Sequence, residues 1–383
     1  MSEKIKVQLP VHLNIIVSLF GLVILFFILI IGAGIIIPLT FAFVFSLFLF
    51  PTVSRMEKAG LPRWLSVFIS LLSIIVILGL VFSLIYGNLL SFSEDFPLMR
   101  KNILRLLKDS QRNIEAYFGI SSENQLPWIN NNLSGFVNTG GKLLNNFLNS
   151  ATTFFTDLFL MPIYIFFMLY YRGVLKGFIN RIIDDEHREK AVVIENQIIE
   201  VIQKYVTGLF TVILIISLLN ITGLWMIGVK HAIFFGALAG LLTIIPYIGV
   251  FIGSLLPILY ALVMTDSLFY PLAVFIWFQL VQMFEGNFIT PNIVGSQVSL
   301  NPLIAIVTLL IGASVWGVSG MILFTPLTAM LKVFLDNIPA LAPYGYLLGQ
   351  GEKSASNKKK TNQMYINTWQ RIKKLFSKKR KSI

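Results

Sequence analysis

Residues 232–264 read AIFFGALAGLLTIIPYIGVFIGSLLPILYALVM, a long apolar run. An α-helix crosses the hydrocarbon core of a bilayer in about 20 residues, so this run is too long for a single span. Near its middle stand Pro246, Tyr247, Ile248 and Gly249, between apolar halves of 14 and 15 residues. Proline removes a helical hydrogen bond and glycine frees the backbone, so the stretch predicts a helical hairpin that is broken at its tip.

A second stretch repeats this design. Residues 303–335 read LIAIVTLLIGASVWGVSGMILFTPLTAMLKVFL, with Gly317 and Gly320 bounding the break. An ordinary apolar span precedes each hairpin, at residues 205–227 and 268–284. If each hairpin enters the bilayer and returns, the two units have opposite orientations, and such inverted repeats hold a substrate site near the midplane. The alternative is that the breaks are packing kinks, which are tolerated in membrane helices.

The composition of the whole chain agrees with a membrane protein. Of its 383 residues 56% are hydrophobic and 13% are charged, and the mean hydropathy is +0.79. Further apolar runs lie at residues 13–31, 35–50, 64–90 and 151–171, and the first two predict a helical hairpin around Gly32. The expected fold is therefore an all-α polytopic membrane protein with about eight hydrophobic segments, two of them broken hairpins.

These runs divide the chain into five parts. Residues 1–90 form three N-terminal spans, and residues 91–150 form a helical extramembrane insertion on the outer side, either a spacer or a substrate lid. Residues 151–204 hold the fourth span and a cytoplasmic helix. Residues 205–335 form a core with both hairpins, and residues 336–383 form a basic cytoplasmic tail.

The net charge of +12 lies mostly in the tail. From Gly351 onward there are eleven Lys or Arg residues and one acid, whereas the preceding part is almost balanced. Basic segments stay in the cytoplasm, so both termini are expected there. Tyr365, Trp369 and Phe376 share one face of a possible tail helix, which predicts contact with anionic lipid and not with nucleic acid. The alternative is a solvated tail that only fixes the orientation.

The sequence contains few residues that could support enzyme catalysis. The chain has no cysteine, and its three histidines, His12, His187 and His231, are far apart in sequence. Gly140, Gly141 and Lys142 resemble part of a phosphate loop, but Leu143 stands where Ser or Thr would hold magnesium. We therefore expect no enzymatic activity, no cofactor and no metal site.

Polar residues within the spans are the candidate site residues, because such groups are costly in hydrocarbon. Gln279, Gln282 and Glu285 fall at intervals of three and form one stripe on a helix face, directed at a cavity or a partner helix. Asn220 lies on the preceding span, and Asp157 interrupts the fourth. The alternative for the amides is hydrogen bonding between helices as packing contacts.

The same segments resemble the AI-2E transporter family. The resemblance is carried by residues 223–229 (GLWMIGV), 236–240 (GALAG), 245–249 (IPYIG), 285–287 (EGN), 301–303 (NPL) and 325–327 (TPL), together with Pro257, Pro291, Gly312 and Gly317. Its order and spacing cover most of residues 205–335. Two positions differ, because members often have glutamine at Leu209 and an acid at Arg172.

This resemblance implies a bacterial inner-membrane protein that exports a small polar solute such as autoinducer-2. Other members are linked to sodium or lithium efflux in exchange for protons. A polar furanose would be bound by hydrogen-bonding side chains, whereas a cation would bind at Glu285 and at unwound backbone. The candidate substrate- or ion-binding residues are Glu285, Asn287, Gln279, Gln282, Asn220, Pro246, Gly249, Gly317 and Gly320.

Other functions are compatible with the same sequence. An uncoupled conduit is the alternative within transport, and a membrane scaffold or receptor that acts through residues 91–150 is the alternative of another class. An intramembrane aspartyl enzyme is disfavoured, because only Asp157 and Glu285 would serve it. Small-residue helix faces favour a homo-oligomer.

Overall fold

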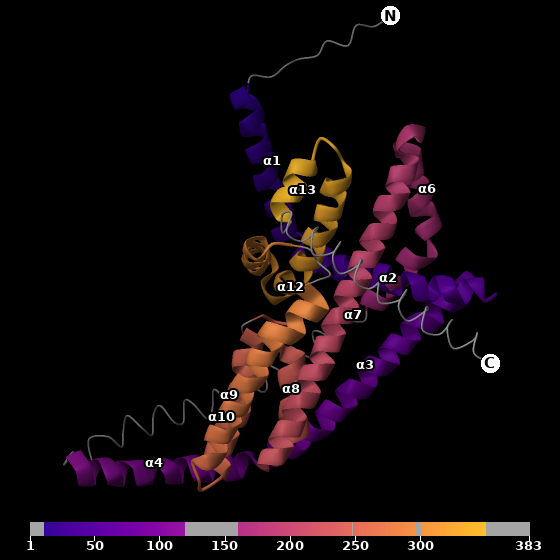
Figure 1. Cartoon of the computed structure of the whole chain (residues 1–383). Helices are drawn as coiled ribbons and strands as arrows, with labels where there is room; N and C mark the ends of the chain where they lie inside the picture. Colours follow the sequence, from indigo (N-terminus) through magenta and orange to yellow (C-terminus); the bar gives the residue numbers. More distant parts are fainter. Residues whose placement is uncertain (1–10, 119–159, 247, 296–299, 350–383) are drawn as a thin grey trace, which may run out of the picture.

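The computed structural model describes residues 11–118, 160–246, 248–295 and 300–349, and they are almost entirely helical (Figure 1). The helices are α1 (Val11–Ile31), α2 (Ala33–Lys58), α3 (Arg63–Glu94), α4 (Phe96–Phe118), α6 (Arg172–Ile182), α7 (Arg188–Ile227), α8 (Ala232–Leu242), α9 (Ile248–Met264), α10 (Phe269–Phe284), α12 (Pro302–Asn337) and α13 (Ala342–Leu348), with a further helical stretch at Leu160–Tyr170. A 3-10 turn, Asp185–His187, precedes α7, and two π-helical segments, η3 (Glu285–Ile289) and η4 (Pro291–Gly295), follow α10.

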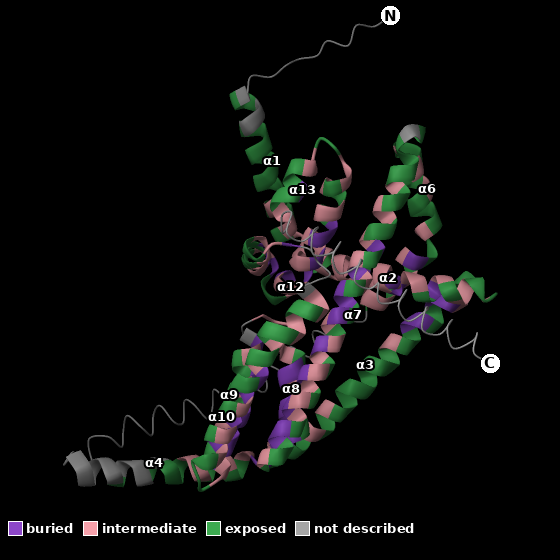
Figure 2. Cartoon of the chain, viewed as in Figure 1, coloured by how far each residue is buried: buried purple, intermediate pink, exposed green. Residues whose placement is uncertain are grey.

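Five helices in the described part are long and apolar enough to cross a bilayer: α2, α3, α7, α12 and the stretch Phe269–Val294. Large apolar side chains along α1 and α3 are exposed, as Figure 2 shows by the green of these two helices. Apolar side chains can face outward in this way where lipid takes the place of water. The all-α polytopic membrane fold is thus confirmed.

The first two apolar runs do not form the expected antiparallel hairpin. Gly32 N donates to the Ile28 carbonyl at 2.8 Å, and Ile36 N donates to the Gly32 carbonyl at 2.9 Å. Helical hydrogen bonds therefore continue on both sides of Gly32, and α1 meets α2 at a bend (Figure 1). The prediction of a hairpin failed because a single glycine permits a bend without ending the helix.

The centre of the molecule is a bundle in which α7 packs against α8, α10 and α12 (Figure 1). Glycines allow the helices to approach closely. A Cβ atom at Gly236 would lie 2.4 Å from the backbone nitrogen of Ile221, and one at Gly240 would lie 2.0 Å from Ser217 Oγ. The first hairpin, formed by α8 and α9, is therefore fixed against α7 by small residues.

The fifth apolar run and the polar helix before it, which the sequence predicts to be cytoplasmic, form one helix without interruption. Together they form the 40-residue helix α7, whose first turns pair with α6 through Lys176 and Glu195 at 2.8 Å. At the first residue of α6, Arg172 forms an ion pair with Glu57 at the end of α2 and lies 5.0 Å from the centre of the Phe50 ring. The basic residue that departs from the family pattern is thus bound to an acid on a neighbouring helix.

Only residues 91–118 of the predicted insertion are described, and they comprise the last turn of α3, Asp95 and the helix α4. This helix crosses one end of the bundle, where Phe96 and Met99 pack against the core shared by α7, α8, α9 and α10 (Figure 1). Arg105 pairs with Asp266, in the α9–α10 connection, at 2.6 Å. Asp157 and residues 350–383, which make up most of the predicted basic tail, lie outside the described residues, so the predictions for them stay untested.

Candidate functional site

The first hairpin is broken where the sequence predicts. The helix α8 ends at Leu242, and α9 begins at Ile248 after a segment that holds the half-buried Pro246. Gly249 is buried, and a Cβ atom there would lie 1.6 Å from the Leu242 carbonyl oxygen. Only glycine permits this contact, so the tip is a tight and specific backbone structure.

The second hairpin is hidden inside α12, which spans 36 residues but folds back on itself. Its turn lies at Trp316 and Gly317, where Gly317 has φ 57° and ψ −133°. On either side Gly312 and Gly320 meet, because a Cβ atom at Gly320 would lie 1.8 Å from the Gly312 carbonyl oxygen. The Trp316 indole nitrogen donates to the Leu29 carbonyl of α1 at 2.9 Å and so anchors the turn.

The two hairpins open toward opposite ends of the molecule (Figure 1). The open end of α8 and α9 lies beside α4, where Lys230 and His231 contact Asp95. The open end of α12 lies beside α13, where Asn301 donates through its side-chain Nδ2 to the Leu347 carbonyl at 2.8 Å. This opposite orientation agrees with the inverted repeat that the sequence predicts.

Glu285 lies where α10 gives way to the π-helical segments. It is half-buried, and Thr290 Oγ1 donates to its Oε1 at 3.4 Å. The following segment, η4, packs on α7, where a Cβ atom at Gly208 would lie 3.1 Å from the Ile293 carbonyl oxygen. π-helical turns are rare and often occur at functional sites. The structure therefore places the one predicted carboxylate at an irregular backbone.

Of the other polar candidates near Glu285, only Gln282 joins it, through a side-chain hydrogen bond. Gln279 is exposed and Gln282 is half-buried, whereas the neighbouring Phe278 and Val281 are buried. Asn287 is exposed, and its Nδ2 donates to the Met283 carbonyl at 2.8 Å. Gln279 thus lies on the outward side of α10 in the single chain, whereas Gln282 lies beside Glu285.

Asn220 is the candidate that the fold buries most. It is 2% exposed on α7, and its side-chain Oδ1 has no hydrogen-bond partner among the described residues. The structure separates it from Glu285, since Asn220 lies within the bundle and Glu285 at the end of α10. The nine predicted residues therefore occupy at least four places, namely the two hairpin turns, the end of α10 and the inner face of α7.

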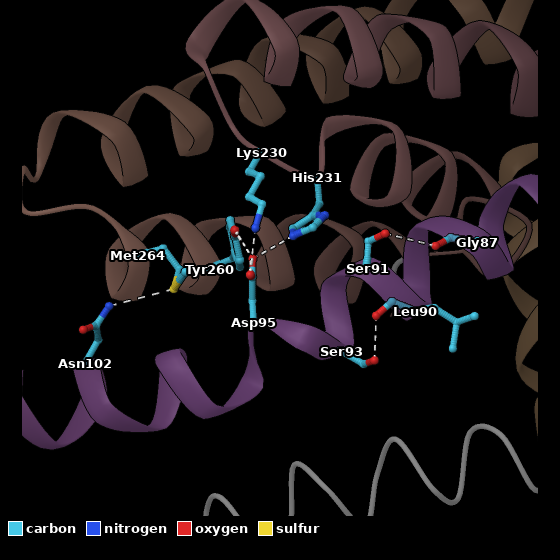
Figure 3. A network of polar contacts seen from close by, with 10 residues as sticks. All are labelled: Gly87, Leu90, Ser91, Ser93, Asp95, Asn102, Lys230, His231, Tyr260 and Met264. Carbon is cyan, nitrogen blue, oxygen red and sulfur yellow. Dashed lines mark hydrogen bonds and ion pairs between the residues drawn. The ribbon is translucent and has the colours of Figure 1, made fainter.

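Sequence reasoning missed a further polar cluster, centred on Asp95 between α3 and α4 (Figure 3). The two oxygens of this 7% exposed carboxylate accept hydrogen bonds from Lys230 Nζ, His231 Nε2 and Tyr260 Oη, each at 2.8 Å. His231 and Tyr260 are themselves 5% and 4% exposed. They come from three distant parts of the sequence and carry no common motif, so only the approach of α4 to the first hairpin reveals them.

A model of one protein family, described as AI-2E family transporter, matches residues 18–340. This match covers most of the chain, including both hairpins and the Asp95 cluster.

The chain belongs to the AI-2E transporter family.

Curated relatives of this AI-2E protein are similar over most of their length. A candidate transport protein of Bacillus subtilis (strain 168), YrrI, is 27% identical over 78% of this chain and 85% of its own. A candidate transport protein of Haemophilus influenzae is 26% identical over 84% and 92%. The AI-2 transport protein TqsA of Escherichia coli (strain K12) is 26% identical over 80% and 86%.

The AI-2E motifs in this chain now have physical explanations. Asn301 caps α12, because its Oδ1 accepts from Ile304 N at 2.8 Å, and Pro302 follows at the first helical position. Gly312 and Gly320 meet between the arms of the second hairpin, and Gly249 meets the Leu242 carbonyl at the turn of the first. These family positions therefore serve the two broken helices directly.

The Asp95 cluster predicts how the stability of this AI-2E protein depends on pH. Burial alone would raise the pKa of Asp95, but hydrogen bonds from Lys230, His231 and Tyr260 outweigh it and lower the pKa from 3.8 to about 2. Because the folded state holds the charged form, this contribution, about 2 kcal/mol, is complete above about pH 4 and is lost as the pH falls toward 2.

We expect this loss to appear in the unfolding of the detergent-solubilised protein between pH 5 and pH 2. Wild-type protein should lose more stability over that interval than Asp95→Asn, which cannot titrate at this position. Parallel pH profiles for the two proteins would contradict the assignment.

Proposed function

We propose that the protein exports a small polar solute such as autoinducer-2 across a bacterial inner membrane, with both termini in the cytoplasm. The arrangement of two hairpins that open toward opposite ends and share α7 is the observation that carries the proposal. In such folds a site between the repeats is exposed alternately to the two sides of the membrane. The name of TqsA supports the choice of autoinducer-2 as the first solute to test.

The energy source in this proposal is an ion gradient. The sequence lacks a complete phosphate loop, which an ATP-driven transporter of this kind would need within the chain. The basic tail, which is expected to bind anionic lipid, would keep the protein oriented in the membrane. A homo-oligomer would cover part of the exposed apolar surface of α1 and α3.

A sodium or lithium–proton antiporter is the second candidate, and Glu285 favours it. This half-buried carboxylate lies at the start of a π-helical segment, where backbone carbonyls deviate from the regular helical pattern. A carboxylate that exchanges a proton for a cation is the minimum requirement of such an antiporter. Neighbouring carbonyl oxygens would complete the coordination of the cation.

Reconstituted vesicles with imposed proton and sodium gradients distinguish these functions. Autoinducer-2 flux and internal pH are followed for wild type, Glu285→Gln and the control Glu94→Gln, which alters an exposed acid at the end of α3. We expect autoinducer-2 flux in all three proteins, within about twofold, because an uncharged solute is bound by hydrogen bonds and not by this charge.

Two other outcomes would change the function assigned to the protein. Sodium-dependent proton movement that is lost only in Glu285→Gln would identify the antiporter. If neither solute nor ions move, the transport proposal is wrong, and a scaffold or receptor role becomes the better explanation.

A further inference from the structure

The buried face of α7 meets two other helices around Asn220. On one side, Ser217 and Ile221 contact Gly240 and Gly236 of α8. On the other side, Ile216 packs with Val281 of α10 in one apolar cluster. Asn220 lies between these two directions on the helix face, so its side chain is enclosed at the junction of α7, α8 and α10.

Trp277 of α10 lies at the same height in this junction as Asn220. The helices α7 and α10 run in opposite directions, with Ile216 and Val281 together in one cluster and Leu224 and Val274 together in another. Midway between these two pairs lie Asn220 on α7 and Trp277 on α10. The Trp277 indole nitrogen lies 2.0 Å from the position that a Cβ atom of Gly223 would occupy. Residues three apart on a helix have Cβ atoms about 5–6 Å apart, so this nitrogen lies about one helical turn from Asn220.

Two atoms at this level are buried without a hydrogen-bond partner among the described residues. One is Asn220 Oδ1, which accepts hydrogen bonds, and the other is Trp277 Nε1, which only donates them. Most buried polar atoms in proteins are hydrogen-bonded, and an unpaired one costs about 1–3 kcal/mol. The alternative of interhelical packing contacts does not explain these two atoms, because neither is bonded to a neighbouring helix in the described part of the chain.

The chemistry of the pair restricts the bound group. A cation would be disfavoured by the indole N–H, and an anion by the amide oxygen. A hydroxyl group can donate to Asn220 Oδ1 and accept from Trp277 Nε1 at the same time. Two hydrogen bonds of about 2.8 Å each can bridge groups about one helical turn apart.

We propose that Asn220 and Trp277 bind a hydroxyl group of the transported solute at the junction of α7, α8 and α10. The proposal rests on the proposed function and refines it, because it assigns the solute to hydroxylated, uncharged molecules. It also adds Trp277, which no motif in the sequence indicates, to the residues that determine specificity. The surrounding apolar side chains would exclude water and strengthen both hydrogen bonds.

Two substitutions remove the two polar atoms while keeping most of the side-chain volume. Trp277→Phe removes the indole N–H, and Asn220→Leu removes the amide oxygen. The matched controls are Trp225→Phe, which alters a 75% exposed indole on α7, and Asn196→Leu, which alters an exposed amide in the first turns of α7. All five proteins are assayed as full chains in vesicles for flux, and in detergent for the rise in melting temperature that a solute causes.

The solutes are autoinducer-2 and a set of analogues that each lack one hydroxyl group. We expect Trp277→Phe and Asn220→Leu each to raise the KM for autoinducer-2 about 3- to 10-fold, the effect of one lost hydrogen bond, with little change in kcat. One analogue should bind wild type more weakly by a similar factor. Both variants should lose that discrimination, and the two controls should keep it.

The experiment distinguishes failure of the proposed binding site from failure of the proposed export function. Autoinducer-2 flux with unchanged KM and unchanged discrimination in both variants would overturn this inference and leave the proposed function intact. Binding that depends on Asn220 and Trp277 but no flux would support the site and contradict export. A large fall in the melting temperature of both solute-free variants would also overturn the inference, because it would show that the two atoms are bonded within the protein itself.

Discussion

Replacing Asp95 by leucine should lower the stability of the protein more than any other single change in its polar side chains, by about 3–5 kcal/mol. The reason is that His231 and Tyr260, which are 5% and 4% exposed, lose their hydrogen-bond acceptor and cannot reach water. Thermal unfolding in detergent measures the loss as a lower melting temperature. The variant should also detach α4 from the first hairpin, which increased proteolysis within α4 would report.

Two control substitutions in the same cluster should each lower the stability by less. Asp95→Asn keeps one oxygen as an acceptor, so it should cost less than Asp95→Leu. Lys230→Met should cost about 1 kcal/mol or less, because the Lys230 side chain is 64% exposed and its charge is solvated. Equal losses for Lys230→Met and Asp95→Leu would show that the buried hydrogen bonds are not the main source of stability here.

The second large effect is expected from Gly320→Ala. The added Cβ atom would lie 1.8 Å from the Gly312 carbonyl oxygen, which is rigid backbone, so the two arms of the second hairpin must separate. Overpacking in a core costs about 1–3 kcal/mol and occasionally more, and solute flux should be lost with it, because the hairpin turn is displaced. Flux in vesicles and the melting temperature in detergent measure the two consequences.

Gly79→Ala is the matched control, since a Cβ atom at Gly79 in α3 meets nothing within 4 Å. Alanine favours a helix over glycine by about 1 kcal/mol, so this variant should be as stable as wild type or slightly more stable. If Gly320→Ala retained wild-type flux and stability, the close contact between the arms would not be required for the fold.

The sequence was most informative about local breaks in long apolar runs. Pro246, Gly249 and Gly317 predicted both hairpin turns, because a helix interruption depends on a few adjacent residues. It was less informative about how helices join. Composition does not reveal whether backbone hydrogen bonds continue from one segment to the next. This continuity decides both the bend at Gly32 and the joining of the fifth apolar run to the preceding polar helix in α7.

The candidate site was predicted in part for a related reason. Asn220 and Glu285 stood out as polar residues in apolar surroundings, whereas the exposed position of Gln279 depends on how α10 is rotated against α7. Asp95 and Trp277 gave no signal, because an acid in a polar insertion and a tryptophan in an apolar span are both ordinary. Their roles arise only from tertiary contacts with residues that are distant in sequence.

The uninterrupted length of α7 has a mechanical consequence. A single helix carries the pairing with α6, the contact of Gly208 with η4 and the contacts of Ser217 and Ile221 with the first hairpin. Hydrogen bonds along its axis make such a helix stiff against twisting. We therefore expect it to rotate as one unit, so that a turn applied at the end that pairs with α6 reorients its contacts with η4 and with the first hairpin together.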